Sequence, residues 1–199
     1  MICTSNKKKF EEISSILKAL NIEFVTPPYE LEVEETANTF LSNAYLKAKA
    51  YHEAFGIPAL ADDSGLVIEA LGGRPGVYSA RFYQDEFGSS VLKEEDFKLS
   101  KDELNNLKVL RLLENEENRR AKFVSAMVLM LSSSQGIFGE GELKGHIARH
   151  PSGSLGFGYD PIFIPEGYDV SLASIEHKNE ISHRRKAINA LFDILKKML

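Results

Sequence analysis

Two adjacent carboxylates, Asp62 and Asp63, follow a short apolar run and lead into Ser64-Gly65. We expect residues 57–61 to form a buried strand, which would place both carboxylates at the carboxyl edge of a sheet, where ligands commonly bind. Adjacent side chains of an extended segment point to opposite faces, so only one is expected to face a site. That carboxylate could hold Mg²⁺ together with substrate phosphates, although Asp, Ser and Gly also form simple turns.

A turn that enters a helix is expected at residues 4–9 (TSNKKK). Free N–H groups and the helix dipole make such a turn a natural anion site, and Lys9 can add a positive charge. A solvated helix cap followed by surface lysines is the other reading. The turn is not a Walker A loop, because the chain has no GxxxxGK(S/T) motif.

Residues 156–161 (GFGYDP) place two aromatic side chains, Phe157 and Tyr159, around a glycine. A flat aromatic ring can stack on a nucleobase, an interaction worth about 1–3 kcal/mol per base. Asp160 could accept a hydrogen bond from a ring N–H. The alternative is a glycine turn whose aromatic side chains lie in the core.

A basic helix start is expected at residues 178–185 (KNEISHRR). Ser182 can cap a helix that has His183 and Arg184 in its first turn, where cations oppose the helix dipole. This mismatch favours a bound anion or an acceptor-rich ligand. The alternative is a solvated basic surface.

The elements that would position these segments alternate early in the chain. Apolar spacing and punctuation by Gly, Pro and Asn predict helices at residues 6–20, 39–55, 102–114 and 182–199, and strands at residues 2–3, 22–25, 57–61, 123–131 and 137–148. This pattern indicates an α/β fold with a mixed sheet and a second lobe built from the central region. We see no linker, and therefore expect one continuous domain over residues 1–199.

Composition limits the function classes. The 199 residues carry 24 Lys and Arg against 29 Asp and Glu, a formal net charge of −5, which argues against a general nucleic-acid coat. The single cysteine, Cys3, excludes an internal disulfide framework, and the longest apolar run, residues 124–131, is too short to span a bilayer. We expect a cytoplasmic protein without membrane or nucleic-acid partners. Neither zinc-ligand spacing nor a GxSxG elbow is found.

Five segments together resemble the inosine/xanthosine triphosphate pyrophosphatases, the Ham1-type family of non-canonical purine nucleotide hydrolases. They occur in the family's order and span nearly the whole chain: residues 4–9, residues 35–48 (beginning ETANTF), residues 61–81 (ADDSGLVIEALGGRPGVYSAR), residues 156–161 and residues 178–184. Ser5 stands where the family usually has glycine.

The resemblance implies a fold and an activity. The fold would be an elongated central mixed β-sheet flanked by helices, with two lobes and a cleft between them. The activity would be Mg²⁺-dependent cleavage of XTP, ITP and dITP to the monophosphate and pyrophosphate, which removes deaminated purine nucleotides. The usual assembly in this family is a homodimer.

The resemblance also implies roles for individual residues. Asp63 would bind the metal and act as general base, with Glu35 as second metal ligand and Glu32 as a possible substitute. The remaining roles concern the substrate. Its triphosphate would be held by Thr4, Ser5, Asn6, Lys7, Lys8 and Lys9, with Lys47 in support, and Ser64 would contact the substrate. Its base would be held by Phe157, Gly158, Tyr159 and Asp160, with further nucleotide contacts from Lys178, His183 and Arg184.

Other function classes stay open on the sequence alone. A nucleotide sensor could keep the pocket without turnover, although it would not need a water-activating carboxylate. A pyrophosphatase of the related Maf-like type would act on modified or pyrimidine nucleotides. A structural module would not be expected to carry all five segments.

Overall fold

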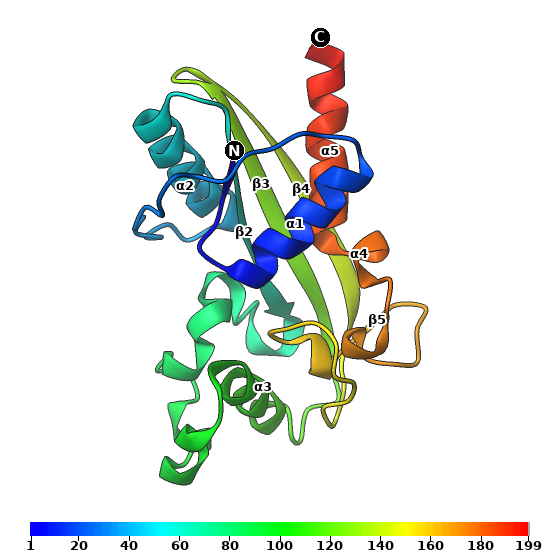
Figure 1. Ribbon diagram of the computed structural model, residues 1–199. Helices are drawn as coiled ribbons and strands as arrows, with labels where there is room; N and C mark the ends of the chain where they lie inside the picture. Colours follow the sequence, from blue (N-terminus) through cyan, green and yellow to red (C-terminus); the bar gives the residue numbers. More distant parts are fainter. Residues whose placement is uncertain (199) are drawn as a thin grey trace. The chain divides into compact units, whose positions relative to one another are not determined.

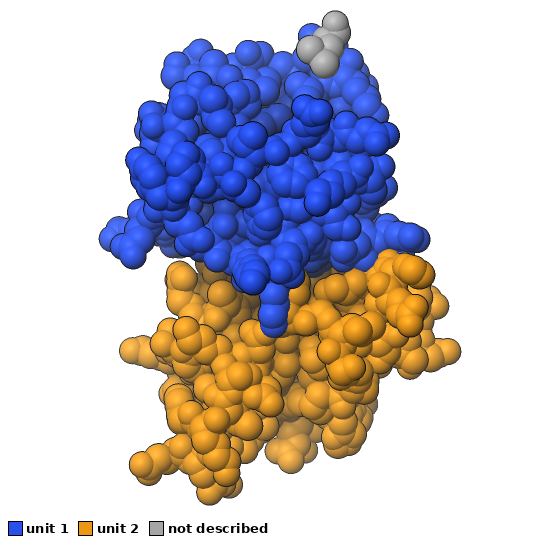
Figure 2. All heavy atoms as spheres, viewed as in Figure 1, with its two compact units in different colours: residues 1–64, 124–142, 179–199 blue, residues 65–123, 143–178 orange. Residues whose placement is uncertain are grey.

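The computed structural model describes residues 1–198, which form two compact units (Figure 2). Unit 1 comprises Met1–Ser64, Val124–Glu142 and Asn179–Leu199, and unit 2 comprises Gly65–Phe123 and Leu143–Lys178. Each unit therefore draws on segments that are distant in the sequence. The second lobe expected from the central region corresponds to unit 2, whereas the cleft stays a prediction.

One five-stranded sheet runs in the order β1-β2-β3-β4-β5. Its strands are β1 (Ile2–Cys3), β2 (Ala59–Ile68), β3 (Arg120–Ser132), β4 (Gln135–Ile147) and β5 (Phe163–Pro165). β1 pairs with β2 in parallel and β4 pairs with β5 antiparallel, so the predicted mixed sheet is confirmed.

Helices cover both faces of the sheet in unit 1 (Figure 1). α1 (Lys7–Ala19) and α5 (His183–Met198) pack on one face, against a cluster that includes Leu60, Met127 and Leu129. α2 (Phe40–Phe55) packs on the other face, with Ala61 and Val128 among its contacts. Successive side chains of a strand point to opposite faces of the sheet, so neighbouring strand residues pack into two separate cores.

The ends of α1 and α2 follow from their capping residues. Asn6 accepts hydrogen bonds from the backbone N–H groups of Lys8 and Lys9, which satisfies two of the free donors at the start of α1. Thr39 caps α2 in the same way, and Gly56 ends it with φ 68°, in the left-handed region that favours glycine. Both helices therefore begin and end close to the predicted residues.

The start of α5 lies unusually close to β4. A Cβ atom on Gly141 would lie 2.2 Å from the carbonyl oxygen of His183, and one on Gly139 would lie 2.3 Å from that of Ala187. Only glycine leaves room for this approach, so these two positions let α5 present its first turn directly against the sheet.

Unit 2 is organised around α3 (Lys101–Leu112), which begins with a capping box between Ser100 and Glu103. Buried polar side chains of α3 hold the segment of residues 76–84. Asn105 Oδ1 accepts from the backbone N–H of Tyr83 at 2.7 Å, and Lys108 Nζ donates to the carbonyl of Phe82 at 2.9 Å. The short helix α4 (Lys178–Ile181) precedes α5.

Two sequence expectations were wrong. Residues 22–25 do not form a strand, because β1 has only two residues and supplies a single backbone bond, from Ile2 N–H to Val25 O. The strand expected at residues 57–61 instead begins at Ala59 and continues to Ile68, so Asp62 and Asp63 lie within β2 and not at its end. Buried side-chain partners keep these turn-forming residue types extended.

The last predicted helix also extended to Leu199, which lies outside the described residues. Within residues 1–198, no helix combines the length and the apolar character needed to cross a membrane.

Candidate active site

The side chains of Asp62 and Asp63 leave β2 on opposite faces. Asp62 points towards α1 and α5, where its carboxylate lies 2.9 Å from Nζ of Lys9 and 3.5 Å from Nε of Arg184. Ser125 of β3 donates a hydrogen bond of 2.6 Å to the same carboxylate. Ser64 Oγ of β2 donates a further hydrogen bond of 2.9 Å, so two cations and two hydroxyls surround Asp62.

These neighbours decide the charge state of Asp62. The residue is 1% exposed, and burial alone would raise its pKa. The charges of Lys9 and Arg184 and the hydrogen bond from Ser125 outweigh the effect of burial, and together they hold the pKa of Asp62 below its usual range. A carboxylate that is ionised and fully engaged is a poor proton acceptor, so Asp62 serves as an anchor for the two cations.

Asp63 has a different environment on the α2 face. Asn43 Nδ2 donates to Asp63 Oδ2 at 3.1 Å, and the backbone N–H of Ser64 donates to Oδ1 at 3.0 Å. Burial raises the pKa of Asp63, and although Lys47 and Lys9 oppose this effect, the pKa stays above its usual value. A carboxylate with a raised pKa takes up a proton more readily, which suits a general base.

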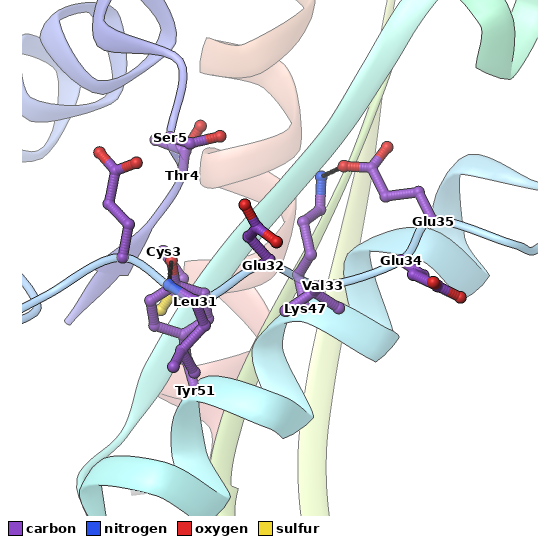
Figure 3. A pocket seen from close by; sticks show the side chains of 11 residues that line it. Cys3, Thr4, Ser5, Leu31, Glu32, Val33, Glu34, Glu35, Lys47 and Tyr51 are labelled. Carbon is purple, nitrogen blue, oxygen red and sulfur yellow. Dashed lines mark hydrogen bonds and ion pairs between the residues drawn. The ribbon is translucent and has the colours of Figure 1, made fainter.

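Lys47 connects Asp63 with the segment that precedes α2. Its Nζ lies 2.9 Å from Glu35 Oε1 and 3.8 Å from Asp63 Oδ1, and Figure 3 shows the side chains of Lys47 and Glu35 meeting. A pocket of about 370 Å³ beside this group is lined by Glu32, Glu35 and Lys47 and by the turn residues Thr4 and Ser5. The predicted triphosphate turn and the predicted metal ligand Glu35 therefore line one pocket of unit 1.

The side chains present fit a magnesium ion. Over residues 1–198, no three His, Cys, Asp or Glu side chains are grouped so as to hold a metal. Mg²⁺ does not need such a group, because it is commonly bound through one or two carboxylates, with phosphate oxygens and waters completing the shell. Glu35 and Asp63 supply two carboxylates, and the Lys47 ammonium shows that the position between them favours positive charge. The exposed Glu32 lines the same pocket and stays an alternative.

The turn of residues 4–9 divides into two kinds of side chain. Ser5, Asn6, Lys7 and Lys8 are exposed, and the Asn6 side chain caps α1. Lys9 is partly buried by its ion pair with Asp62. The turn is therefore a capped helix start, and its residues Thr4 and Ser5 also border the pocket. Its phosphate contacts stay a prediction.

The basic start of α5 is buried, so the alternative of a solvated surface is wrong. Ser182 Oγ accepts from the backbone N–H of Arg185, as a cap does, and both His183 and Arg184 are buried. Arg184 donates to Glu12 at 2.9 Å and to Ser64 Oγ at 2.7 Å.

These contacts give Arg184 a role within unit 1 itself, in joining α5 to α1 and β2. Contacts of His183 and Arg184 with a nucleotide stay predictions.

The predicted base loop lies in unit 2 and is held by Asp160. Oδ2 of Asp160 accepts from the backbone N–H of Phe157 at 3.0 Å and from Lys178 Nζ at 2.5 Å. The same ammonium lies 4.9 Å from the centroid of the Phe157 ring. A Cβ atom on Gly156, whose φ is 78°, would lie 2.0 Å from Asp160 Oδ2, so only glycine permits this closed loop. The structure thus brings the predicted residues Phe157, Asp160 and Lys178 together.

Tyr159 differs from its neighbours in this loop. It is buried, and its hydroxyl donates to the carbonyl of Ser79 at 2.7 Å. Burial also raises the pKa of Tyr159, so the phenol stays protonated. The reading of an aromatic side chain in the core is therefore right for Tyr159, whereas Phe157 is only partly buried.

Sequence reasoning missed three buried side chains that hold this centre: Glu12, Asn43 and Ser125. Asn43 is the most informative, because its Oδ1 also accepts from the backbone N–H of Ala37 at 2.9 Å. It therefore ties the Glu35 segment to Asp63. A polar residue on the apolar face of a predicted helix was the available signal for Asn43, since α2 would otherwise bury an unpaired amide.

The fold and these contacts define an α/β protein with a carboxylate and lysine centre suited to phosphate chemistry. A model described as the Ham1 family matches residues 1–194. A protein named dITP/XTP pyrophosphatase from Hydrogenobaculum sp. (strain Y04AAS1) is 74% identical over 208 residues, covering 100% of this chain and 99% of that protein. One of the same name from Aquifex aeolicus (strain VF5) is 52% identical over 198 residues, covering 98% of this chain and 96% of that protein.

Solved structures agree with the sequence relatives. The Staphylococcus aureus Ham1 protein matches with a TM-score of 0.80 and 35% identity, covering 100% of this chain and 98% of that one. A HAM1 protein from Coxiella burnetii matches with a TM-score of 0.79 and 35% identity, covering 98% and 97%. The chain belongs to the Ham1 family, as the sequence motifs indicated.

Proposed function

We infer that this chain is a nucleoside-triphosphate pyrophosphatase that cleaves XTP, ITP and dITP to the monophosphate and pyrophosphate. Its family membership and the name dITP/XTP pyrophosphatase carried by the two relatives support this function. The observation that carries it in the structure is Asp63, a buried carboxylate with a raised pKa beside Lys47 and Glu35. That arrangement pairs a proton acceptor with groups that attract a metal and phosphates.

Asp63 and Glu35 would hold Mg²⁺, which supplies charge neutralisation on the phosphates when bound. Asn43 keeps Asp63 in place from the α2 side, and the Ser64 N–H does so along β2. Because Asn43 also binds the backbone N–H of Ala37, it holds the segment that carries Glu35 in position relative to Asp63.

Asp63 is proposed to take the proton from a water that attacks the α-phosphorus. The new bond joins the water oxygen to that phosphorus, and the bond from phosphorus to the bridging oxygen of pyrophosphate breaks. General base assistance of this kind contributes about 10²–10⁴-fold. Lys9 and Lys47 supply positive charge for the phosphates and the leaving group.

Phe157, Gly158, Tyr159 and Asp160 are proposed to bind the base, with Phe157 stacking on it and Lys178 in support. His183 and Arg184 are proposed donors to the 6-oxo group. A donor aimed at this oxygen would meet an amino group in adenine, and an unpaired buried donor costs about 1–3 kcal/mol. A site built to hydrogen-bond its substrate can discriminate further.

The proposed cellular role is removal of deaminated purine nucleotides in the cytoplasm, by a homodimer without nucleic-acid or membrane partners. The ordinary acidic composition, with a net charge of −5, supports the absence of a general nucleic-acid surface. Sedimentation of the purified protein tests the dimer.

Hydrolysis of a substrate panel tests the function. We expect turnover of XTP, ITP and dITP with Mg²⁺, and little turnover of ATP, GTP and TTP. Preference for a pyrimidine nucleotide would favour the Maf-like alternative. Tight nucleotide binding without turnover would favour the sensor.

A further inference from the structure

Two side chains of α3 hold the backbone of Gly158 from both sides. Asp102 Oδ2 accepts from the Gly158 N–H at 3.0 Å, and Asn106 Nδ2 donates to the Gly158 carbonyl at 3.0 Å. Asp102 and Asn106 are four residues apart, so they lie on one face of the helix. All three residues belong to unit 2.

This pair fixes the two peptide groups that flank Gly158. The N–H belongs to the peptide that follows Phe157, and the carbonyl belongs to the peptide that precedes Tyr159. Gly158 has φ 61°, and a Cβ atom placed on it would meet no atom within 4 Å, so side-chain packing on that side does not hold it in position. These two hydrogen bonds therefore help to orient Phe157, together with the two hydrogen bonds that the Phe157 backbone makes with Asp160 and the Lys178 ammonium beside its ring.

The side chain of Asn106 contributes mainly its hydrogen bond to the Gly158 carbonyl. It is buried, and its Oδ1 finds no hydrogen-bond partner among residues 1–198. A buried amide that leaves one atom unpaired is unfavourable for stability, which makes an exclusively structural role a poor explanation for it. The bond to Gly158 is what Asn106 contributes.

We propose that Asp102 and Asn106 are specificity-determining positioning residues, which set the Phe157 ring for a 6-oxopurine by clamping the Gly158 backbone. The proposal rests on the function proposed above, in which this loop binds the base. Side chains on a helix hold a site more precisely than loop residues do. The loop thereby takes its geometry from α3.

The test compares Asp102→Ala with Asp102→Asn, which keeps an oxygen acceptor for the Gly158 N–H. Loss of one hydrogen bond changes a binding constant by roughly 2- to 10-fold. We expect Asp102→Ala to raise KM for ITP by about that factor, to leave kcat nearly unchanged, and to lower the preference for ITP over ATP. Asp102→Asn should restore most of both properties.

Asn106→Leu is the second variant, and it keeps the experiment informative if Asp102→Ala does not fold. Leucine has a similar shape, and it removes the unpaired Oδ1 along with the donor, so the fold should be retained. Arg111→Gln is the matched control, because Arg111 lies on the same helix but pairs with Asp96, outside the loop. It should lower stability without changing the preference for ITP.

Calorimetric titration separates the base from the phosphates, with inosine monophosphate and inorganic pyrophosphate as probes. Asp102→Ala and Asn106→Leu should weaken binding of inosine monophosphate and leave pyrophosphate unchanged. Unaltered KM and preference in both folded variants, or equal weakening of both probes, would overturn the proposal. A wild-type protein that does not hydrolyse ITP would instead overturn the proposed function, so the two failures are distinguishable.

Discussion

Asp62 and Asp63 are neighbours in β2, yet their carboxylates lie in opposite electrostatic environments. Asp62 is held by Lys9 and Arg184, and its pKa is lowered, whereas burial raises the pKa of Asp63. The strand's alternation thus separates a structural anion from a proton acceptor within one dipeptide. The two positions should respond differently to the same substitution.

Asp62→Asn should destabilise the protein by about 3–5 kcal/mol, because in a buried setting Lys9 would lose its carboxylate partner and Arg184 would keep only Glu12. Chemical denaturation measures this loss. Glu69→Gln is the matched control, since Glu69 pairs with Arg120 at the surface, where such pairs contribute under about 1 kcal/mol. Equal effects of the two substitutions would contradict the role given to Asp62.

The stability of the wild type should also depend on pH through Asp62. Its folded pKa lies below the usual value of 3.8, so its stabilisation is fully present above that value. The stabilisation is lost as the pH falls from 3.8 through the folded pKa. Unfolding free energies measured down the acid range should therefore decline less steeply for Asp62→Asn than for the wild type. Parallel declines would show that Asp62 titrates normally.

Asp63→Asn should abolish most turnover without destabilising the fold. A raised folded pKa means that the charged carboxylate is less favourable in the folded state than in the unfolded chain at neutral pH, and the amide removes this unfavourable term. Activity on ITP should fall by at least about 10²-fold, while the melting temperature stays at or above that of the wild type. Comparable turnover in folded Asp63→Asn would refute the assignment of the base.

Glu35→Gln should weaken metal binding far more than Glu32→Gln. Glu35 shares Lys47 with Asp63, whereas Glu32 is exposed on the rim of the same pocket. Titration with Mn²⁺, followed by electron paramagnetic resonance, measures binding without relying on turnover. Loss of a direct ligand should cost at least the about 10- to 100-fold that loss of an outer partner costs. A larger loss of Mn²⁺ affinity in Glu32→Gln would mean that Glu32, and not Glu35, is the second metal ligand.

Much of the fold could be predicted from local signals. The caps Asn6 and Thr39 and the apolar spacing of α1 and α2 place these helices within a residue or so. A strand was wrongly predicted at residues 22–25, because the strand pattern is present but β1 is too short to form a ladder with it.

The extent of β2 could not be predicted, because it depends on partners that are distant in the sequence. Asp-Asp-Ser-Gly favours a turn locally, but Lys9, Asn43 and Arg184 compensate the two buried carboxylates and let the strand continue. The clamp on Gly158 has the same origin, since nothing local in the base loop indicates that α3 holds it.

Hydrolysis of ITP in water enriched with the heavy oxygen isotope tests the central claim most directly. If the Asp63-activated water attacks the α-phosphorus, mass spectrometry will find the label in inosine monophosphate and none in pyrophosphate. Label in pyrophosphate would mean attack at the β-phosphorus, and release of inosine diphosphate with labelled phosphate would mean attack at the γ-phosphorus. Either result would contradict the mechanism proposed for this site.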